Sequence, residues 1–168
     1  MSTDADRGIA SVFRETMASV CTPVSVVTGL DGGLPHGTTV SAFASLSLDP
    51  PMVLVALDLS SELLALVRRT RRFGINVLSS GQADLARRFA GKGGAAKFAG
   101  VPWEREAGVP RIPGAGSFLA CEVADLVPGG DHLVVLGGVV AARAAAEAPL
   151  TYHGRVFGTH AALDEASR

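Results

Sequence analysis

Small hydrogen-bonding side chains are spaced between apolar residues in segment 37–58, GTTVSAFASLSLDPPMVLVALD. A half-buried strand normally alternates apolar and polar residues, whereas this segment sets hydroxyls among valine, phenylalanine and leucine. Such a wall can hold a flat polar ring through hydrogen bonds. Each hydroxyl taken singly could instead bond a backbone group and bind no ligand. The hydroxyl residues of the segment are Thr38, Thr39, Ser41, Ser45 and Ser47.

Two adjacent serines, Ser60 and Ser61, come directly before a leucine-rich helical pattern, SSELLALVRRTRR. The first turn of a helix presents unpaired backbone N–H groups and the positive end of the helix dipole, and both favour an anion. The pattern therefore indicates either a phosphate site at these serines or a serine that only caps the helix.

Motifs of several enzyme classes are missing from the sequence. There is no GxGxxG after a first strand, so a Rossmann unit would not bind a dinucleotide here. GxSxG, HExxH and P-loop motifs are also absent, and the four histidines show no metal-ligand spacing. Hydrolase and metalloenzyme functions are therefore excluded, and no metal is expected.

Composition sets further limits. A chain of 168 residues with 48% hydrophobic residues is expected to form one compact domain with a large core and a buried subunit interface. Its net charge of -1 gives no basic field for nucleic acid or a membrane surface. The N-terminal MSTDADRG lacks the features of a secretory signal, so we expect a cytoplasmic protein. Cys21 and Cys121 are expected to be buried, reduced thiols.

The elements that must position these residues follow from hydrophobic periodicity. Residues 9–20 form an amphipathic pattern that predicts a helix, which we expect to plug one end of a barrel. Residues 23–29, 38–48 and 52–58 have strand character, and the first two should pair as an antiparallel hairpin. The helical pattern after Ser61 follows them.

The second half of the chain also favours strands. Residues 73–79 predict a strand, 82–90 a short helix and 91–100 a glycine-rich mobile loop. Further strands are expected at 117–128, 131–145 and 155–160, although 139–148 has the composition of a helix as well. More strands than helices indicate a mainly β protein, an antiparallel barrel with peripheral helices.

Several motifs together resemble those of the flavin reductase family. The hydroxyl-rich strand with its LDPP turn matches the family's TVSSF-like strand and S-x-S-LDPP turn, and Gly130-Asp131-His132 matches its G-D-H signature. Residues 73–79, 85–100 and 149–158 match further family patterns. The resemblance covers residues 9–160, with 1–8 expected as a flexible N-terminus and 161–168 as a tail. It implies a homodimer with the split β-barrel fold of FMN-binding proteins.

The resemblance also assigns site residues by position. It places Thr38, Thr39, Val40, Ser41, Ala42, Ala44 and Ser45 along the isoalloxazine ring and Ser60 and Ser61 at the flavin phosphate. It makes Phe89, Ala90 and Lys97 contacts to the outer half of the flavin, and Tyr152, His153 and Arg155 contacts to the dinucleotide or to flavin of the other subunit. His132 would position NAD(P)H, with Asp131 orienting its imidazole. Phe89 could instead be a core aromatic and Lys97 a solvated surface lysine.

The implied activity is reduction of free FAD or FMN by NADH or NADPH. Hydride transfer needs alignment of two rings rather than a catalytic acid or base. The resemblance further implies that reduced flavin is released to a separate flavin-dependent monooxygenase. Two alternatives remain open at this point: an enzyme like pyridoxamine-phosphate oxidase, and a flavin-binding protein without reductase activity.

Overall fold

The computed structural model describes residues 4–163. Its helices are α1 (Asp4–Ala18), α2 (Glu62–Thr70) and α3 (Ala83–Ala90), with short 3₁₀ turns η1 (Ser80–Gln82) and η2 (Gly94–Phe98). The first strands are β1 (Thr22–Pro23), β2 (Ser25–Asp31), β3 (Leu34–Val40), β4 (Phe43–Leu48), β5 (Pro51–Asp58) and β6 (Arg72–Val77). The later strands are β7 (Glu104–Glu106), β8 (Val109–Arg111), β9 (Ser117–Gly129), β10 (His132–Ala144), β11 (Leu150–His153) and β12 (Val156–Thr159).

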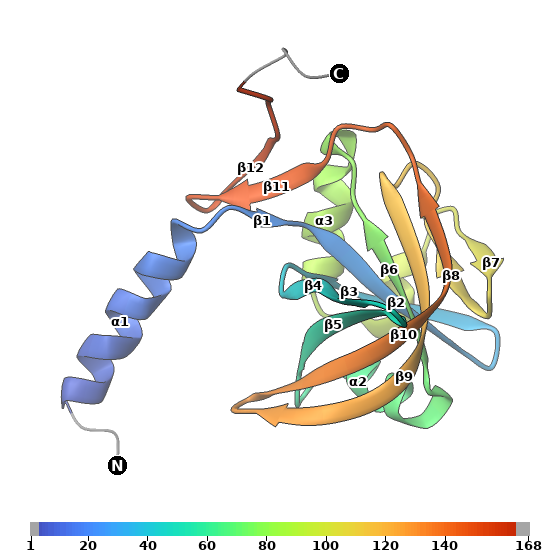
Figure 1. Cartoon of the computed structure of the whole chain (residues 1–168), viewed down its shortest axis with the longest axis horizontal. Coiled ribbons are helices and arrows are strands. Elements are labelled where there is room, and N and C mark those ends of the chain that lie inside the picture. The colour runs from blue at the N-terminus through green and yellow to red at the C-terminus, as the bar shows by residue number, and fades with distance from the viewer. Residues whose placement is uncertain (1–3, 164–168) are drawn as a thin grey trace.

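A seven-stranded antiparallel sheet in the order β3-β2-β6-β9-β10-β5-β4 forms the body of the protein and curls around one core (Figure 1). Its interior face carries alternate residues of the strands, as the period of two requires. Val27, Val55, Phe73, Ile75 and Val135 are fully buried there. The expected mainly β architecture is therefore confirmed.

The expected hairpin of the first two strands is present as β2 and β3, in which Val27 pairs with Thr38. Its turn uses Gly32 at φ +55° and Gly33 at φ +84°, a left-handed conformation that costs glycine little. The expected strand 38–48 is not continuous, however. β3 ends at Val40 on one edge of the sheet, and β4 begins at Phe43 on the other edge.

The chain crosses between the two edges of the sheet at residues 41 and 42. At this crossing, the Ala56 N–H donates a hydrogen bond to the Ala42 carbonyl at 2.9 Å, so residue 42 already belongs to the β5 side. Residues 41 and 42 therefore carry the chain from one sheet edge to the other. Periodicity alone did not reveal this crossing, because both halves of the segment have strand composition.

Helix α1 departs from its expected position. It begins at Asp4 rather than at residue 9 and projects away from the barrel instead of plugging it (Figure 1). Its apolar stripe is uncovered in the single chain, with Ile9 71% and Phe13 61% exposed. Periodicity shows that a helix has an apolar face, but it does not show which surface covers that face. None of the helices in residues 4–163 is long and apolar enough to cross a membrane.

Two smaller expectations are also resolved. Residues 139–144, which could have been helical, continue strand β10 to Ala144. Both cysteines are free thiols, but only Cys121 is buried, so the expectation of a buried Cys21 was wrong. Burial raises the pKa of the Cys121 thiol to about 12.

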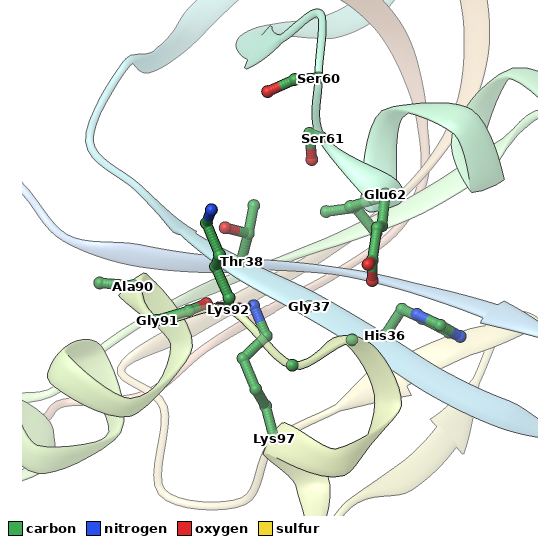
Figure 2. A pocket seen from close by; sticks show the side chains of 13 residues that line it. His36, Gly37, Thr38, Ser60, Ser61, Glu62, Ala90, Gly91, Lys92 and Lys97 are labelled. Carbon is green, nitrogen blue, oxygen red and sulfur yellow. Dashed lines mark hydrogen bonds between the residues drawn. The ribbon is translucent and has the colours of Figure 1, made fainter.

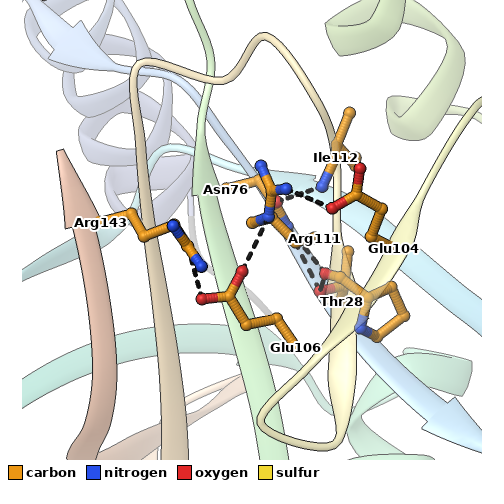
Figure 3. Close-up of polar contacts among 8 residues, drawn as sticks. Thr28, Asn76, Glu104, Glu106, Arg111, Ile112 and Arg143 are labelled. Carbon is orange, nitrogen blue, oxygen red and sulfur yellow. Dashed lines mark hydrogen bonds and ion pairs between the residues drawn. The ribbon is translucent and has the colours of Figure 1, made fainter. Parts of the chain in front are cut away.

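A buried polar network fastens the β7–β8 hairpin to the barrel (Figure 3). The Asn76 side chain donates to the Pro110 carbonyl at 3.3 Å and accepts the Ile112 N–H at 2.7 Å. The Thr28 hydroxyl donates to the same Pro110 carbonyl at 2.7 Å. On the outside of the hairpin, Glu106 pairs with Arg143 at 2.6 Å. The inner bonds satisfy backbone groups that the barrel buries.

Replacing Asn76 with Ala should therefore lower the free energy of unfolding by roughly 1–3 kcal/mol, because the Ile112 N–H and the Pro110 carbonyl lose a partner. Asn76→Asp should be at least as damaging, since a carboxylate would face the Val26 and Pro110 carbonyl oxygens. Urea unfolding followed by circular dichroism measures both. A loss below about 0.5 kcal/mol, the scale of an ordinary surface substitution, would contradict the anchoring role.

Candidate functional site: a trough between strand β3 and helix α2

Two adjoining clefts form a trough beside β3. The larger cleft, of about 440 Å³, lies between β3, the first turn of α2 and the loop that follows α3 (Figure 2). The smaller, of about 250 Å³, runs along residues 38–42 to the end of β5 and the start of β10. Thr38 and Ser61 line both clefts, so the trough is continuous at these two side chains.

The trough brings together most of the residues expected at the site. Those that line it are Thr38, Thr39, Val40, Ser41, Ala42, Ser60, Ser61, Ala90, Lys97 and His132. They come from five separate parts of the chain: β3, the turn before α2, the end of α3, the η2 turn and the start of β10. Of these parts, β3, the turn before α2 and the start of β10 meet at the smaller cleft.

Strand β3 orients its two threonines in opposite directions. The Thr39 hydroxyl donates to the Ala86 carbonyl of α3 at 2.7 Å, so it holds the helix to the sheet. Thr38, one residue earlier, faces the trough, and among the described residues its hydroxyl has no hydrogen-bond partner. Of the two threonines, Thr38 therefore has the hydroxyl that remains available to a ligand.

The turn before α2 leaves one serine free. Ser60 donates to Asp58 Oδ1 at 2.6 Å through both its backbone N–H and its hydroxyl. Ser61 occupies the N-cap position with φ -68° and ψ 126°, but its side chain makes no capping bond. Neither serine hydroxyl thus caps the helix. The Ser61 hydroxyl and the unpaired N–H groups of the first turn face the trough together, which suits an anion.

Asp58 organises this turn, although its role was not predicted from the sequence. The hydrogen bond from the Ser60 hydroxyl lowers the pKa of Asp58, and the Ser60 N–H and nearby His132 act in the same direction. The Asp-x-Ser spacing of residues 58–60 is a turn signature that could have indicated it. Asp58 thereby keeps its charge and holds the Ser60 hydroxyl away from the ligand.

His132 lies directly beside Asp58, because the two residues pair on the neighbouring strands β10 and β5. Its Nδ1 lies 2.7 Å from Asp131 Oδ1, so the expected orienting contact is present. The Leu59 N–H donates to the Asp131 carbonyl at 3.0 Å and joins this loop to the serine turn. The imidazole therefore stands at the smaller cleft, next to the turn that begins α2.

Lys97 is neither a solvated lysine nor a free cation. Its Nζ donates to the Phe89 and Gly91 carbonyls, each at 3.1 Å, and so satisfies backbone groups where α3 ends. Burial lowers the pKa of Lys97, while the Glu62 carboxylate opposes that shift. Phe89 is fully buried and packs on Phe98 at a ring-centroid distance of 4.8 Å, so it is a core aromatic.

Besides Phe89 and Asp131, which line neither cleft, five expected residues lie outside the trough in the single chain. Ala44 and Ser45 belong to β4, where they pair with Leu54 and Val53. Tyr152, His153 and Arg155 lie on the β11–β12 hairpin of a separate three-stranded sheet. Of these, His153 lines another cleft, of about 410 Å³, together with Cys21 and Phe157.

Three polar side chains that line the larger cleft were not anticipated: His36, Glu62 and Lys92. Lys92 and Lys97 extend into the cleft from the loop opposite α2 (Figure 2). The only sequence signal for Lys92 was the glycine-rich composition around it, which indicated a loop at a ligand site. Among the described residues, no group of three His, Cys, Asp or Glu side chains could hold a metal ion.

The free groups of the trough suit a flavin. Residues 38–42 offer a narrow wall with one free threonine hydroxyl for a planar ring, and the start of α2 with Ser61 offers donors to a phosphate. His132 stands at the ring end, where a second planar group could stack. The residues present therefore fit a ring, a phosphate and a nicotinamide in one continuous site.

Comparison with known proteins agrees with this geometry. The flavin reductase like domain matches residues 17–161. The chain is 40% identical over 146 residues, 87% of this chain and 78% of the relative, to the reductase component of a 4-nitrophenol 4-monooxygenase/4-nitrocatechol 2-monooxygenase from Rhodococcus opacus. It is 39% identical to the NADH:riboflavin 5'-phosphate oxidoreductase of Streptomyces pristinaespiralis over 88% of this chain and 86% of the relative.

A solved structure supports the same assignment. The NADH:FAD oxidoreductase SgcE6 of Streptomyces globisporus C-1027, in complex with NAD and FAD fragments, superposes with a TM-score of 0.86. It shares 32% identity, and the match covers 98% of each chain. The family model spans most of the chain, and the first relative is 40% identical to this chain over most of the length of both proteins. This protein therefore belongs to the flavin reductase family.

Proposed function

We propose that the protein catalyses the reduction of free FAD or FMN by NADH or NADPH and supplies the reduced flavin to a partner monooxygenase. The observation that carries this proposal is the continuity of the trough at Thr38 and Ser61, which joins a ring-sized cleft to a phosphate-binding helix start. Relatives named as reductase components of monooxygenases support it.

The residues act by alignment. The bound flavin supplies the hydride acceptor. Residues 38–42 position the flavin ring, while Ser61 and the first turn of α2 hold its phosphate. His132, oriented by Asp131, places the nicotinamide over that ring. No residue needs to transfer a proton in the hydride step, and holding the two reactants in a reactive geometry lowers its barrier.

Both clefts of the trough are partly open to solvent, which suits a flavin that binds, is reduced and leaves. The proposal therefore treats flavin as a substrate that diffuses to the monooxygenase. It locates the protein in the cytoplasm, where NAD(P)H is available, without nucleic-acid or membrane partners.

A homodimer is part of the proposal. The apolar stripe of α1 stands away from the barrel (Figure 1), and the outer part of the β11–β12 hairpin, with Tyr152 and Val156, is exposed in the single chain. A second copy would cover the stripe and could bring Tyr152, His153 and Arg155 to the flavin of its neighbour. This arrangement gives those three residues the role that the family resemblance implies.

The two alternatives fit less well. An enzyme like pyridoxamine-phosphate oxidase calls for more basic residues at its phosphate-bearing substrate, whereas Lys92 and Lys97 are the only lysine or arginine side chains lining the larger cleft within the described residues. A passive flavin-binding protein has no need of His132 held at the ring end by Asp131.

The test is steady-state oxidation of NADH and NADPH, followed by the absorbance of the reduced nicotinamide against a matched flavin blank, with riboflavin, FMN, FAD or no flavin added. We expect turnover that depends on added flavin. Flavin binding by fluorescence titration without any turnover would overturn the reductase and favour the passive binder.

A further inference from the structure

The Glu62 carboxylate is an unexpected group in the larger cleft. Glu62 is the first residue of α2, and its side chain is directed along the cleft toward His36, away from Ser60 (Figure 2). Among residues 4–163 it forms no hydrogen bond and no ion pair within contact distance. A carboxylate in a cleft without a protein partner can accept hydrogen bonds from a ligand.

Gly94 and His36 complete this end of the cleft. A Cβ added to Gly94 would lie 2.7 Å from Glu62 Oε2 and 3.8 Å from His36 Cε1, so Gly94, at φ +50°, adjoins both side chains. The His36 Nδ1 is shielded from solvent and has no hydrogen-bond partner among the described residues. We call Glu62, His36 and Gly94 the Glu62 end of the cleft.

The volumes leave room for more than a phosphate at this end. The smaller cleft, which is proposed to hold the flavin ring, measures about 250 Å³. The larger cleft, on the other side of Ser61, measures about 440 Å³. A ligand that stopped at its phosphate, held by Ser61 and the first turn of α2, would leave the Glu62 end empty. A ligand with a further group past the phosphate would fill it.

The chemistry of a carboxylate selects that group. A carboxylate hydrogen-bonds the vicinal hydroxyls of a ribose and rejects a phosphate attached to them, as acidic residues do at the 2′-hydroxyl in other dinucleotide sites. Lys92 on the opposite wall suits the diphosphate between ribose and ring, whereas Lys97 is held by the Phe89 and Gly91 carbonyls. Glu62 and Lys92 thus provide an acceptor end and a cationic wall of the cleft.

We propose that the Glu62 end is the subsite for an adenosine ribose with free hydroxyls, so that the larger cleft binds an ADP moiety. The inference rests on the proposed function for the identity of the whole ligand, because FAD and NADH both carry this moiety. Glu62 then determines specificity: it favours FAD over FMN if the flavin occupies the cleft, or NADH over NADPH if the nicotinamide cofactor does.

The first experiment measures ADP binding by calorimetry, which needs no turnover. Wild type should bind ADP, and Glu62→Ala should weaken it about ten-fold. Asp84→Asn is the matched control, because Asp84 is an acidic first-turn residue of α3 with a 98% exposed side chain outside the trough. Glu62→Gln provides a second variant if Glu62→Ala lowers the melting temperature. Absence of ADP binding to wild type, or equal binding by all variants, overturns the subsite.

Kinetic arms distinguish the two sources of the ADP moiety. If FAD supplies it, Glu62→Ala raises the KM for FAD about ten-fold and leaves FMN and riboflavin unchanged. If NADH supplies it, Glu62→Ala raises the KM for NADH about ten-fold with FMN as the acceptor. The ratio of kcat/KM for NADH to that for NADPH then falls. Unchanged ratios in both arms overturn the specificity role. Failure of the proposed function differs, since wild type would then show no turnover with any flavin.

Discussion

Replacing Ser61 with Ala should weaken FMN and FAD binding by about ten-fold or more and leave riboflavin binding unchanged. The Ser61 hydroxyl is free at the start of α2, and one hydrogen bond to a charged group contributes about 1.5–3 kcal/mol. Riboflavin has no phosphate and so does not use this group. Fluorescence titration of the three flavins measures the effect.

Ser60→Ala is the matched control for that experiment. The Ser60 hydroxyl is bonded to Asp58, so its loss should change phosphate binding much less than the loss of Ser61. It removes the main cause of the low Asp58 pKa, which should rise toward its ordinary value and be seen by NMR titration. Equal loss of all three flavins in Ser61→Ala would place the phosphate elsewhere.

Replacing His132 with Ala should raise the KM for NADH about ten-fold while the dissociation constant of the flavin changes little. The imidazole lines the smaller cleft and is held by Asp131, whereas Glu62 and the loop after α3 line only the larger cleft. A ten-fold change corresponds to about 1.4 kcal/mol, the scale of one lost contact. Steady-state kinetics at saturating flavin measure it.

Two further variants make the His132 result specific. Asp131→Ala keeps the imidazole but removes its orienting contact, so it should raise the KM for NADH in the same direction by a smaller factor. His160→Ala removes a histidine beyond β12, outside the trough, and should leave all constants unchanged. Unchanged kinetics in His132→Ala would remove this residue from the nicotinamide site.

Asp58 and Ser60 show how a small turn joins two functions of the trough. Asp58 pairs with His132 across the sheet and accepts both donors of Ser60. The same carboxylate therefore lies between the nicotinamide end and the phosphate end. Its low pKa keeps it charged over the pH range in which the serine turn must remain in place.

Local pattern determined much of the fold. The hairpin of β2 and β3, helix α2 with its preceding serines, and the long β9–β10 pair follow from periodicity and turn residues. These features depend on neighbours in sequence, and for that reason single-sequence reasoning reached them. The set of hydroxyls and the G-D-H tripeptide were also visible, and the family resemblance supplied their roles.

Tertiary structure alone decided which of these groups share a site. Strand period two turns Thr38 to the trough and Thr39 to α3, but only the packing of α3 shows which face is which. The β5–β10 register brings His132 beside Asp58, and the loop after α3 brings Lys92 and Gly94 to Glu62. These contacts join residues far apart in the chain, so no local pattern encodes them.

The exposed apolar face of α1 also separates what the sequence determines from what only the structure decides. Sequence determined that the helix is amphipathic, whereas only the structure showed that the barrel of its own chain does not cover it. Amphipathic periodicity records that a face must be buried and leaves its partner unspecified. What the sequence determined was therefore the chemistry available along each element, and what the tertiary structure decided was which of those groups meet around one ligand.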